Sequence, residues 1–389
     1  MPVETFDPGS TQALADVSRG GLSRRELIKS VIASGAVVSA GTLLVGCGPS
    51  GETPVQAGGV ERLISLNVNG KVRRVDVLPQ ETLAQTLRYK LGLTGTKLGC
   101  DRGECGACTI LIDDVPIYSC STLTHSVKGR GVTTVEGLQA ADGALHPVQQ
   151  AMITHHGAQC GFCTPGFVMS LYAAWCAGMD FTNVAEIETL LSGNLCRCTG
   201  YGPIVSAGEA LARWARPQWA TDRVLGDISA LAQMAATTTK SLDLKCQGQR
   251  YSAPASLEEL QTLYAENPSA QILSGATDIG LWVTKQHRQL PHLIHIGNVA
   301  ELDSLKKTDG HITIGAGVTH QQAMEALAED YPALQEIWSR FGSAQVRASA
   351  RVCGNIANAS PIGDLSPCFL ALDSQIVLNK AGKRRQIKL

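Results

Sequence analysis

The apolar positions near residues 62–77 alternate with polar ones, which is the period of a strand with one buried face. Two such runs, 62–68 and 71–77, are separated by Asn69-Gly70, a preferred pair for a tight hairpin turn. Farther on, Leu83, Leu87 and Leu91 repeat at helical spacing. The pattern therefore predicts a β-hairpin followed by a helix over 82–91.

Longer apolar stretches predict three more helices. The first runs to Ala177, with Thr164 as its cap and Pro165 as its first residue; the others cover 184–191 and 203–215. From Tyr251 the pattern becomes α+β. Residues 270–280 are typical of a strand, a glycine turn and a helix, and 312–317 of a strand before a capping box of Thr319 and Gln322.

The first 60 residues follow neither pattern. The pair Arg24-Arg25 precedes a run of small and apolar residues, 31–46, which is shorter than the ~20 residues of a membrane-spanning helix. We interpret 1–47 as a twin-arginine-type signal that directs the protein to the periplasm. Cys47 ends a lipoprotein-like box and is a candidate lipid anchor, and 48–60 is a linker. The alternative is an uncleaved helix of a cytoplasmic protein.

Composition narrows the class of protein that this chain can be. The length of 389 residues favours two or three domains, and an apolar content of 44% is ample for a core. A net charge of -1 disfavours nucleic-acid binding. The 13 cysteines are too few for a disulfide scaffold, in which more than ~8–10% of residues are Cys. Eight of them form two quartets, which indicates metal or cluster chemistry.

The first quartet is Cys100, Cys105, Cys108 and Cys120. The spacing C-x4-C-x2-C…C is that of plant-type [2Fe–2S] proteins. A short loop can supply three thiolates to a compact cluster if its backbone turns back on itself, which Gly103 and Gly106 allow. Zinc is the alternative, but zinc sites prefer paired C-x2-4-C knuckles.

The second quartet is Cys160, Cys163, Cys196 and Cys198. Its pairs fall beside the starts of two predicted helices, where the helix dipole stabilises an anionic cluster. Taken alone, C-x2-C with C-x-C fits zinc or iron–sulfur. Beside the first quartet it predicts a second [2Fe–2S] cluster.

The motifs Q-C-G-F-C-T-P-G at 159–166 and G-N-L-C-R-C-T-G-Y at 193–201 resemble the iron–sulfur portion of the molybdenum hydroxylases, the relatives of xanthine dehydrogenase and aldehyde oxidase. The resemblance implies an α+β multidomain chain. It would hold a β-grasp [2Fe–2S] ferredoxin domain at 61–135, a four-helix [2Fe–2S] domain at 136–215, a linker at 216–250 and an FAD-binding domain of the PCMH type at 251–389.

The stretches G-A-T-D-I-G at 275–280 and A-R-V-C-G-N-I at 350–356 are similar to the FAD-binding domain of the same family. Carried over by motif, the expected FAD contacts are Ile272, Leu273, Ser274, Gly275, Ala276, Thr277, Asp278, Ile279, Phe341, Arg351, Val352, Cys353, Gly354, Asn355 and Asp364. Cys353 stands where the family usually has glycine, so we expect its side chain to crowd the nucleotide. The domain is expected to be C-terminally incomplete, with a separate flavoprotein fragment as a candidate partner.

The resemblance implies an oxidoreductase subunit that transfers electrons. Substrate is oxidised at molybdenum, on a molybdopterin-binding large subunit, and no residue of this chain is catalytic. Electrons pass to the second quartet's cluster, then to the first, then to FAD. The alternative is a non-flavin, ferredoxin-like subunit of a periplasmic aldehyde oxidoreductase. A zinc-stabilised binding protein is a third class, which metal analysis distinguishes.

Overall fold

The computed structural model describes residues 63–214, 241–308, 310–359, 363–380 and 382–389. The described residues all belong to one compact unit, Val60–Leu389. The expected export signal, Cys47 and the linker 48–60 lie outside the described residues. Within the described ranges, no helix has the length and apolar character needed to cross a membrane.

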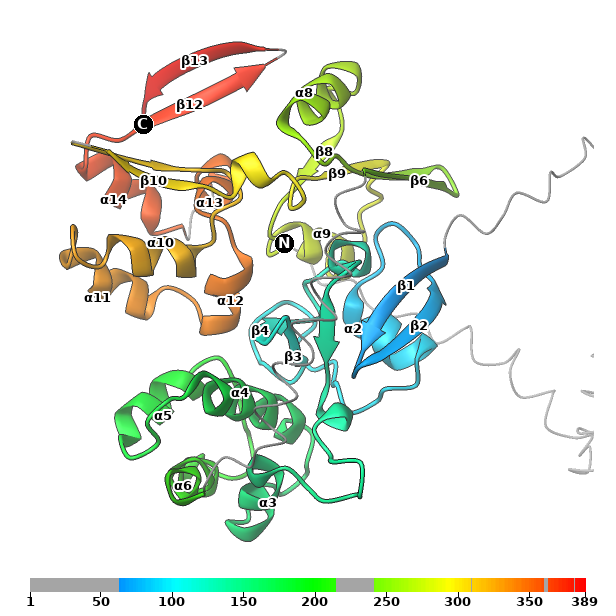
Figure 1. The fold of residues 1–389 in the computed structure, drawn as a ribbon, viewed down its shortest axis with the longest axis vertical. Coiled ribbons are helices and arrows are strands. Elements are labelled where there is room, and N and C mark those ends of the chain that lie inside the picture. Colours follow the sequence, from blue (N-terminus) through cyan, green and yellow to red (C-terminus); the bar gives the residue numbers. More distant parts are fainter. Residues whose placement is uncertain (1–62, 215–240, 309, 360–362, 381) are drawn as a thin grey trace, which may run out of the picture. The chain divides into compact units, whose positions relative to one another are not determined.

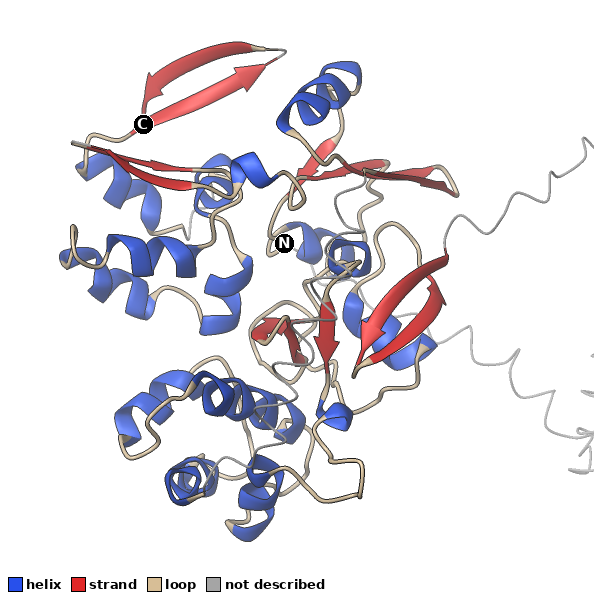
Figure 2. Cartoon of the chain, in the orientation of Figure 1, coloured by secondary structure: helices blue, strands red, loops and turns tan. Residues whose placement is uncertain are grey.

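The first domain is a five-stranded mixed sheet of order β2-β1-β5-β3-β4 (Figures 1 and 2). The expected hairpin forms as β1 and β2, which pair in antiparallel register. The sheet buries one apolar face against helix α2 and the π-helical turn that continues it, so the β-grasp prediction is confirmed. The elements are β1 (Leu63–Val68), β2 (Lys71–Asp76), α2 (Leu83–Gln85), the turn Thr86–Lys90, β3 (Thr109–Ile112), β4 (Val115–Tyr118) and β5 (Gly131–Thr133).

Four helices form the next domain, as predicted, and Figure 1 shows them grouped in green. Helix α4 is buried from Gly166 to Trp175 because its residues are almost all apolar, and the other helices pack around it. The helices are α3 (Pro147–Thr154), α4 (Thr164–Ala177), α5 (Val184–Leu191) and α6 (Gly202–Ala210).

The last domain begins with a four-stranded sheet of order β6-β7-β9-β8, in which β9 runs parallel to both of its neighbours. Two separate hairpins, β10-β11 and β12-β13, accompany it. The strands are β6 (Leu242–Cys246), β7 (Gln249–Ala253), β8 (Gln271–Leu273), β9 (His292–His295), β10 (Leu305–Thr308), β11 (His311–Ile314), β12 (Gln375–Lys380) and β13 (Lys383–Lys388).

Helices of this domain connect and cover the strands. One group, with Trp338 at its centre, packs into an apolar cluster of its own. The predicted capping box of Thr319 and Gln322 is present at the start of α10. The helices are α8 (Leu257–Glu266), α9 (Ile279–Thr284), α10 (His320–Leu327), α11 (Ala333–Arg340), α12 (Ala344–Ser349), α13 (Val352–Ala357) and α14 (Leu365–Ala371).

Two expectations about local structure are corrected. Thr164 does not cap α4; Cys163 occupies the cap position, because its carbonyl oxygen already accepts from the amides of Gly166 and Phe167. The linker expected at 216–250 is strand in its described end, since β6 and β7 pair across Gln247-Gly248. Both turn residues have positive φ, the geometry of a tight hairpin turn. The many polar side chains of β6 and β7 leave no clear apolar alternation, so the sequence pattern did not predict these strands.

Candidate metal and cofactor sites

The first cysteine quartet is brought together by the sheet. Cys108 directly precedes β3, and one residue, Ser119, separates Cys120 from the end of β4. These strands are antiparallel, with Thr109 opposite Tyr118, so the two cysteines are placed at one end of the sheet. The Ser119 amide donates to the Cys108 carbonyl oxygen at 3.3 Å, and both thiols are almost fully buried.

The loop from Cys100 to Cys108 wraps its backbone amides around sulfur. The amides of Arg102, Glu104 and Cys105 donate to Cys100 Sγ at 3.3–3.4 Å, and the Cys100 amide donates to Cys105 Sγ at 3.3 Å. Gly103 and Gly106 adopt φ near +73° and +72°, as the predicted turn requires. Amides aimed at sulfur favour thiolate, the form that binds iron.

The thiols of this quartet also contact one another. Hydrogen bonds from Cys105 and Cys120 lower the pKa of Cys100, and a bond with Cys120 lowers that of Cys108. The donors in these bonds, Cys105 and Cys120, have raised pKa values. These contacts link the four thiols to one another.

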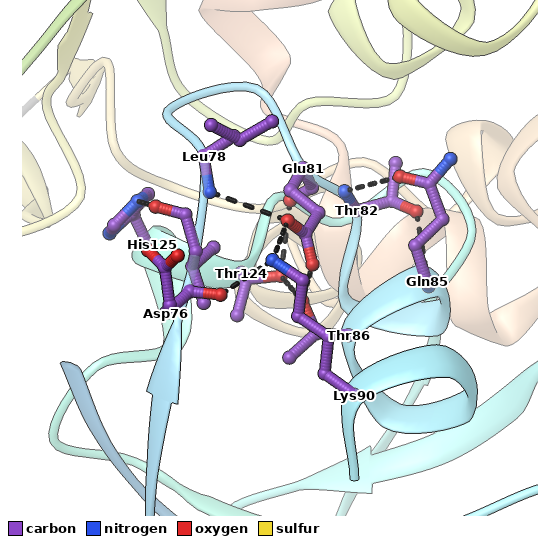
Figure 3. Close-up of polar contacts among 10 residues, drawn as sticks. Asp76, Leu78, Glu81, Thr82, Gln85, Thr86, Lys90, Thr124 and His125 are labelled. Atoms are coloured by element: carbon purple, nitrogen blue, oxygen red, sulfur yellow. Dashed lines mark hydrogen bonds and ion pairs between the residues drawn. The ribbon is translucent and has the colours of Figure 1, made fainter. Parts of the chain in front are cut away.

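Helix α2 holds Cys120 in place through its first amides. Leu83 N donates to the Thr122 carbonyl oxygen at 2.8 Å and Ala84 N to that of Ser119 at 3.1 Å, one on each side of Cys120. The helix start is fixed by a capping box between Thr82 and Gln85. Beside it, the buried Glu81 carboxylate accepts from Thr86 and Lys90, at 2.7 and 2.5 Å (Figure 3).

The second quartet lies at the surface, next to the starts of α4 and α6. Cys160 and Cys198 are exposed, and Cys163 and Cys196 are partly buried. The Thr199 amide and hydroxyl lie 3.5 and 3.1 Å from Cys196 Sγ, and the amide donates to it. Hydrogen bonds join Cys160 to Cys198 and Cys163 to Cys196, and burial raises the pKa of Cys163 to about 12.

The loops of the two quartets touch directly. Leu195 N, one residue before Cys196, donates to the carbonyl oxygen of Cys105 at 2.9 Å. The approach requires glycine: a Cβ on Gly106 would lie 2.3 Å from the Gly193 carbonyl oxygen, and one on Gly166 would lie 2.1 Å from that of Gly106. The backbone of one ligand loop is thus hydrogen-bonded to that of the other.

Residues of the last domain surround a cavity of about 310 Å³. The two motifs predicted to bind FAD meet there, because a Cβ on Gly275 would lie 2.1 Å from the Ser349 carbonyl oxygen. The expected residues that line it are Ile272, Ser274, Gly275, Ala276, Thr277, Asp278, Ile279, Arg351, Cys353, Gly354 and Asn355.

Three buried polar atoms of this lining fit an anionic, hydrogen-bonding ligand. Ser274 Oγ, Arg351 Nε and Asn355 Oδ1 have no hydrogen-bond partner within the described part of the chain. Burial lowers the pKa of Arg351 to about 10, so its guanidinium stays charged at neutral pH. Unpaired buried polar atoms next to a cavity are costly unless a ligand satisfies them. The donors Arg351 Nε and Ser274 Oγ suit a pyrophosphate, and the acceptor Asn355 Oδ1 suits a sugar hydroxyl.

Four expected contacts do not line this cavity. Leu273 and Val352 are buried in apolar clusters, Phe341 packs against His320 with ring centroids 4.7 Å apart and ring planes tilted by 52°, and Asp364 is exposed before α14. Other lining residues were not foreseen: Gln271, Trp282, Ile296, Ala316, Ala350, Ala357 and Asn358. Trp282 lies one helical turn after Asp278, a spacing that could have revealed it.

Cys353 lines the cavity, but its backbone is helical, within the first turn of α13. Its position therefore does not demand the conformational freedom of glycine. The thiol faces the Ile314 carbonyl oxygen at 3.8 Å, and burial raises its pKa. Crowding of a nucleotide by this sulfur stays a prediction.

Helix α9 connects the cavity to the first quartet. Its residues Ile279 and Trp282 line the cavity. A Cβ on Gly280 would lie 2.9 Å from Ser121 Cα, the residue after Cys120. Thr284 Oγ1 donates to the carbonyl oxygen of Asp101, the residue after Cys100, at 2.8 Å. One short helix thus contacts both sites.

Across the described ranges, no three His, Cys, Asp or Glu side chains are arranged to hold a single metal ion. A [2Fe–2S] cluster needs a different arrangement from a single ion, because its four thiolates are divided between two irons.

Three family models match the chain in sequence. Residues 66–135 match a 2Fe-2S iron-sulfur cluster binding domain, and residues 134–209 match a [2Fe-2S] binding domain. Residues 244–389 match the FAD binding domain in molybdopterin dehydrogenase. The three matches follow one another along nearly the whole described chain.

Among curated proteins, the chain is similar to xanthine dehydrogenases. It is 32% identical to that of Drosophila subobscura, over 79% of this chain and 27% of the relative. Against xanthine dehydrogenase 2 of Arabidopsis thaliana the identity is 31%, over 82% and 29%. The chain therefore spans less than a third of the length of these relatives.

Solved structures with similarity include quinoline 2-oxidoreductase from Pseudomonas putida 86, at 42% identity over 39% of this chain and 96% of that chain, with a TM-score of 0.36. Aldehyde oxidoreductase from Desulfovibrio gigas is 38% identical over 39% of this chain and 17% of that chain, with a TM-score of 0.37.

Proposed function

Because the chain belongs to the molybdenum hydroxylase family, with that family's two [2Fe–2S] domains and FAD-binding domain, we propose that it works as the electron-transfer subunit of a xanthine dehydrogenase- or aldehyde oxidoreductase-like enzyme. When bound, the two clusters and FAD supply one- and two-electron transfer. The protein's own part is to hold the ligand loops close together and to aim amides at their sulfurs.

One observation carries this proposal: the loop of the first quartet contacts both other sites. Cys105 accepts from Leu195 on the side of the second quartet. Asp101 and Ser121 contact α9 on the side of the flavin cavity. The second quartet, the first quartet and the cavity are thus joined in series by direct contacts, which suits stepwise electron transfer.

We propose a molybdopterin-binding partner chain that docks over the second quartet. Two of its cysteines are exposed, and so is Gln159, the first residue of the motif at 159–166. Phe162, Leu195 and Tyr201 expose 47%, 55% and 39% of their surfaces around these cysteines. Exposed aromatic and apolar side chains are typical of interface cores. Substrate oxidation would take place on that partner.

We further propose that the subunit is exported to the periplasm. Arg24-Arg25 before a weakly apolar run supports a twin-arginine route, which carries folded proteins. Clusters inserted before export would protect their cysteine ligands from oxidation in the periplasm.

The central test is iron content and electron paramagnetic resonance of the full chain. We expect four irons and two distinct reduced [2Fe–2S] signals. Cys105→Ala should abolish one signal and Cys163→Ala the other, because each removes one thiolate ligand. Cys368→Ala, outside both quartets, is the matched control and should keep both. Zinc in place of iron, or two irons in total, would contradict the proposal.

A further inference from the structure

A buried polar group lies beside the contact between the two ligand loops. Asn194 Nδ2 donates to the carbonyl oxygen of Gly106 at 3.2 Å, next to the bond from Leu195 N to Cys105 O. Asn194 is 2% exposed. Its amide therefore holds the first quartet's loop against the second quartet's loop.

The orientation of this amide is set jointly by α4 of the helical domain and by a residue from outside both iron–sulfur domains. Asn194 Oδ1 accepts from Ser170 Oγ at 2.7 Å and from Gln345 Nε2 at 3.4 Å. Gln345 Nε2 also donates to Ser170 Oγ at 3.0 Å. Two donors on Oδ1 turn Nδ2 toward Gly106. Gln345 belongs to α12 of the FAD-binding domain and is 1% exposed, as is Ser170.

The junction is closely packed around Gly193. A Cβ on Gly193 would lie 2.2 Å from Gln345 Oε1 and 2.8 Å from the Tyr118 hydroxyl. That hydroxyl donates to the Gly193 carbonyl oxygen at 2.6 Å. Elements of all three domains therefore meet here: β4 with Tyr118, the loop after α5, and α12.

We propose that Gln345 is a positioning residue, through which the FAD-binding domain orients Asn194 and so fixes the contact between the two ligand loops. Docking of the FAD-binding domain would then set the electronic coupling between the clusters, an inference that rests on the proposed function. The flavin domain thereby influences a site that it does not itself bind.

The test is Gln345→Glu in the full chain. A carboxylate presents only acceptors, so it would repel the partly negative Asn194 Oδ1 and attract Nδ2 instead. The Asn194 amide should flip, and the bond to Gly106 should be lost. We expect the Leu195 amide to exchange with deuterium about tenfold faster, the effect of losing one buried hydrogen bond. We also expect a changed magnetic interaction between the reduced clusters.

Gln335→Glu is the matched control, because Gln335 Nε2 makes one part-buried bond, to Met324 O, within the same domain. It should leave both readouts unchanged. Asn194→Asp removes the donor to Gly106 while keeping the acceptor for Gln345, so it should reproduce the Gln345→Glu effects. If Gln345→Glu does not fold, Gln345→Met, which removes the donors at similar length, replaces it with the same expectation.

Unchanged exchange and unchanged magnetic interaction in the Gln345 variants would overturn the inference. Hydrogen exchange does not require bound clusters, so it decides the inference even if iron analysis contradicts the proposed function. Four irons with Gln345 variants identical to the control would leave the proposed function standing and the positioning role refuted.

Discussion

At the scale of single residues, Arg351 distinguishes a binding cavity from an ordinary packing gap. Its guanidinium donates to the Ser349 carbonyl oxygen at 2.8 Å, while Nε has no partner within the described residues. The negative charge of Asp303 raises the pKa of Arg351, but burial lowers it by more. A buried cation of this kind is stabilised by an anionic ligand.

Arg351→Met should weaken FAD binding by about 10- to 150-fold, since a hydrogen bond to a charged group contributes about 1.5–3 kcal/mol. Titration of the apoprotein with FAD measures this. Cys353→Ala is the neighbouring control: it removes volume but no charge, so affinity should hold or rise. Equal losses in both variants would contradict an anion-binding role for Arg351.

His125 is a residue with a predictable pH dependence. Burial lowers its pKa to about 4, while the hydrogen bond with Val77 and the charge of Glu81 raise it by less. Its Nε2 lies 3.2 Å from Val77 O. The unfolded chain takes up a proton near pH 6.5, which the folded protein accepts only near pH 4. Stability contributed by neutral His125 is therefore complete above about pH 6.5 and falls as the pH drops toward 4.

His125→Gln keeps a donor for Val77 O but cannot titrate. The advantage of the wild type over this variant in free energy of unfolding should shrink by about 2 kcal/mol between pH 7 and pH 5. Urea unfolding at the two pH values measures it. A difference that does not change with pH would show that the folded protein protonates His125 as readily as the unfolded chain.

At the scale of elements, α2 and the turn after it link the first ligand loop to the sheet. Glu81 is 9% exposed and accepts from Leu78 N, Thr86 Oγ1 and Lys90 Nζ, while its backbone oxygen accepts from Thr124 N (Figure 3). These bonds fix the helix whose first amides hold the residues around Cys120.

Glu81→Ala should lower the free energy of unfolding by about 1–3 kcal/mol, because it leaves buried donors without an acceptor. It should also accelerate iron loss from the first quartet, followed by loss of that cluster's absorbance. Glu336→Ala removes an exposed ion pair with Arg340 and should cost less than about 1 kcal/mol. Equal effects of the two substitutions would show that the Glu81 bonds do not support the site.

At the scale of the whole molecule, three domains share one junction. Each domain has an apolar cluster, and a few apolar side chains cross between domains: Leu111 of the sheet domain packs in the helical cluster, and Leu123 packs in a cluster of the last domain. Beside these apolar contacts, the junction holds the polar and glycine-backbone contacts described above. Such a junction specifies orientation strongly, because each buried polar group has few acceptable partners.

Export is also a property of the whole molecule. Arg24→Lys combined with Arg25→Lys should retain the protein in the cytoplasm, folded and with its irons bound, because only the export signal is changed. Cell fractionation with iron analysis of each fraction measures this. Periplasmic delivery equal to that of the wild type would contradict the twin-arginine interpretation.

The sequence by itself determined the features that depend on short-range spacing. The β1-β2 hairpin follows from alternation around Asn69-Gly70, and α4 from an unbroken apolar run. Both cysteine quartets were predictable, because ligand loops need fixed intervals and local glycines. The FAD motifs identified most of the cavity lining for the same reason: each is one continuous turn of backbone.

Only the tertiary structure decided which parts come into contact across long stretches of chain. Gln345 and Ser170 are 175 positions apart, and Thr284 and Asp101 are 183 apart, so neither periodicity nor motif spacing could pair them. Phe341 and Val352 were both expected FAD contacts, yet they pack with the apolar cluster around Trp338. Whether a residue faces a ligand, a core or another domain depends on which distant segment folds against it, and the local sequence does not specify that segment.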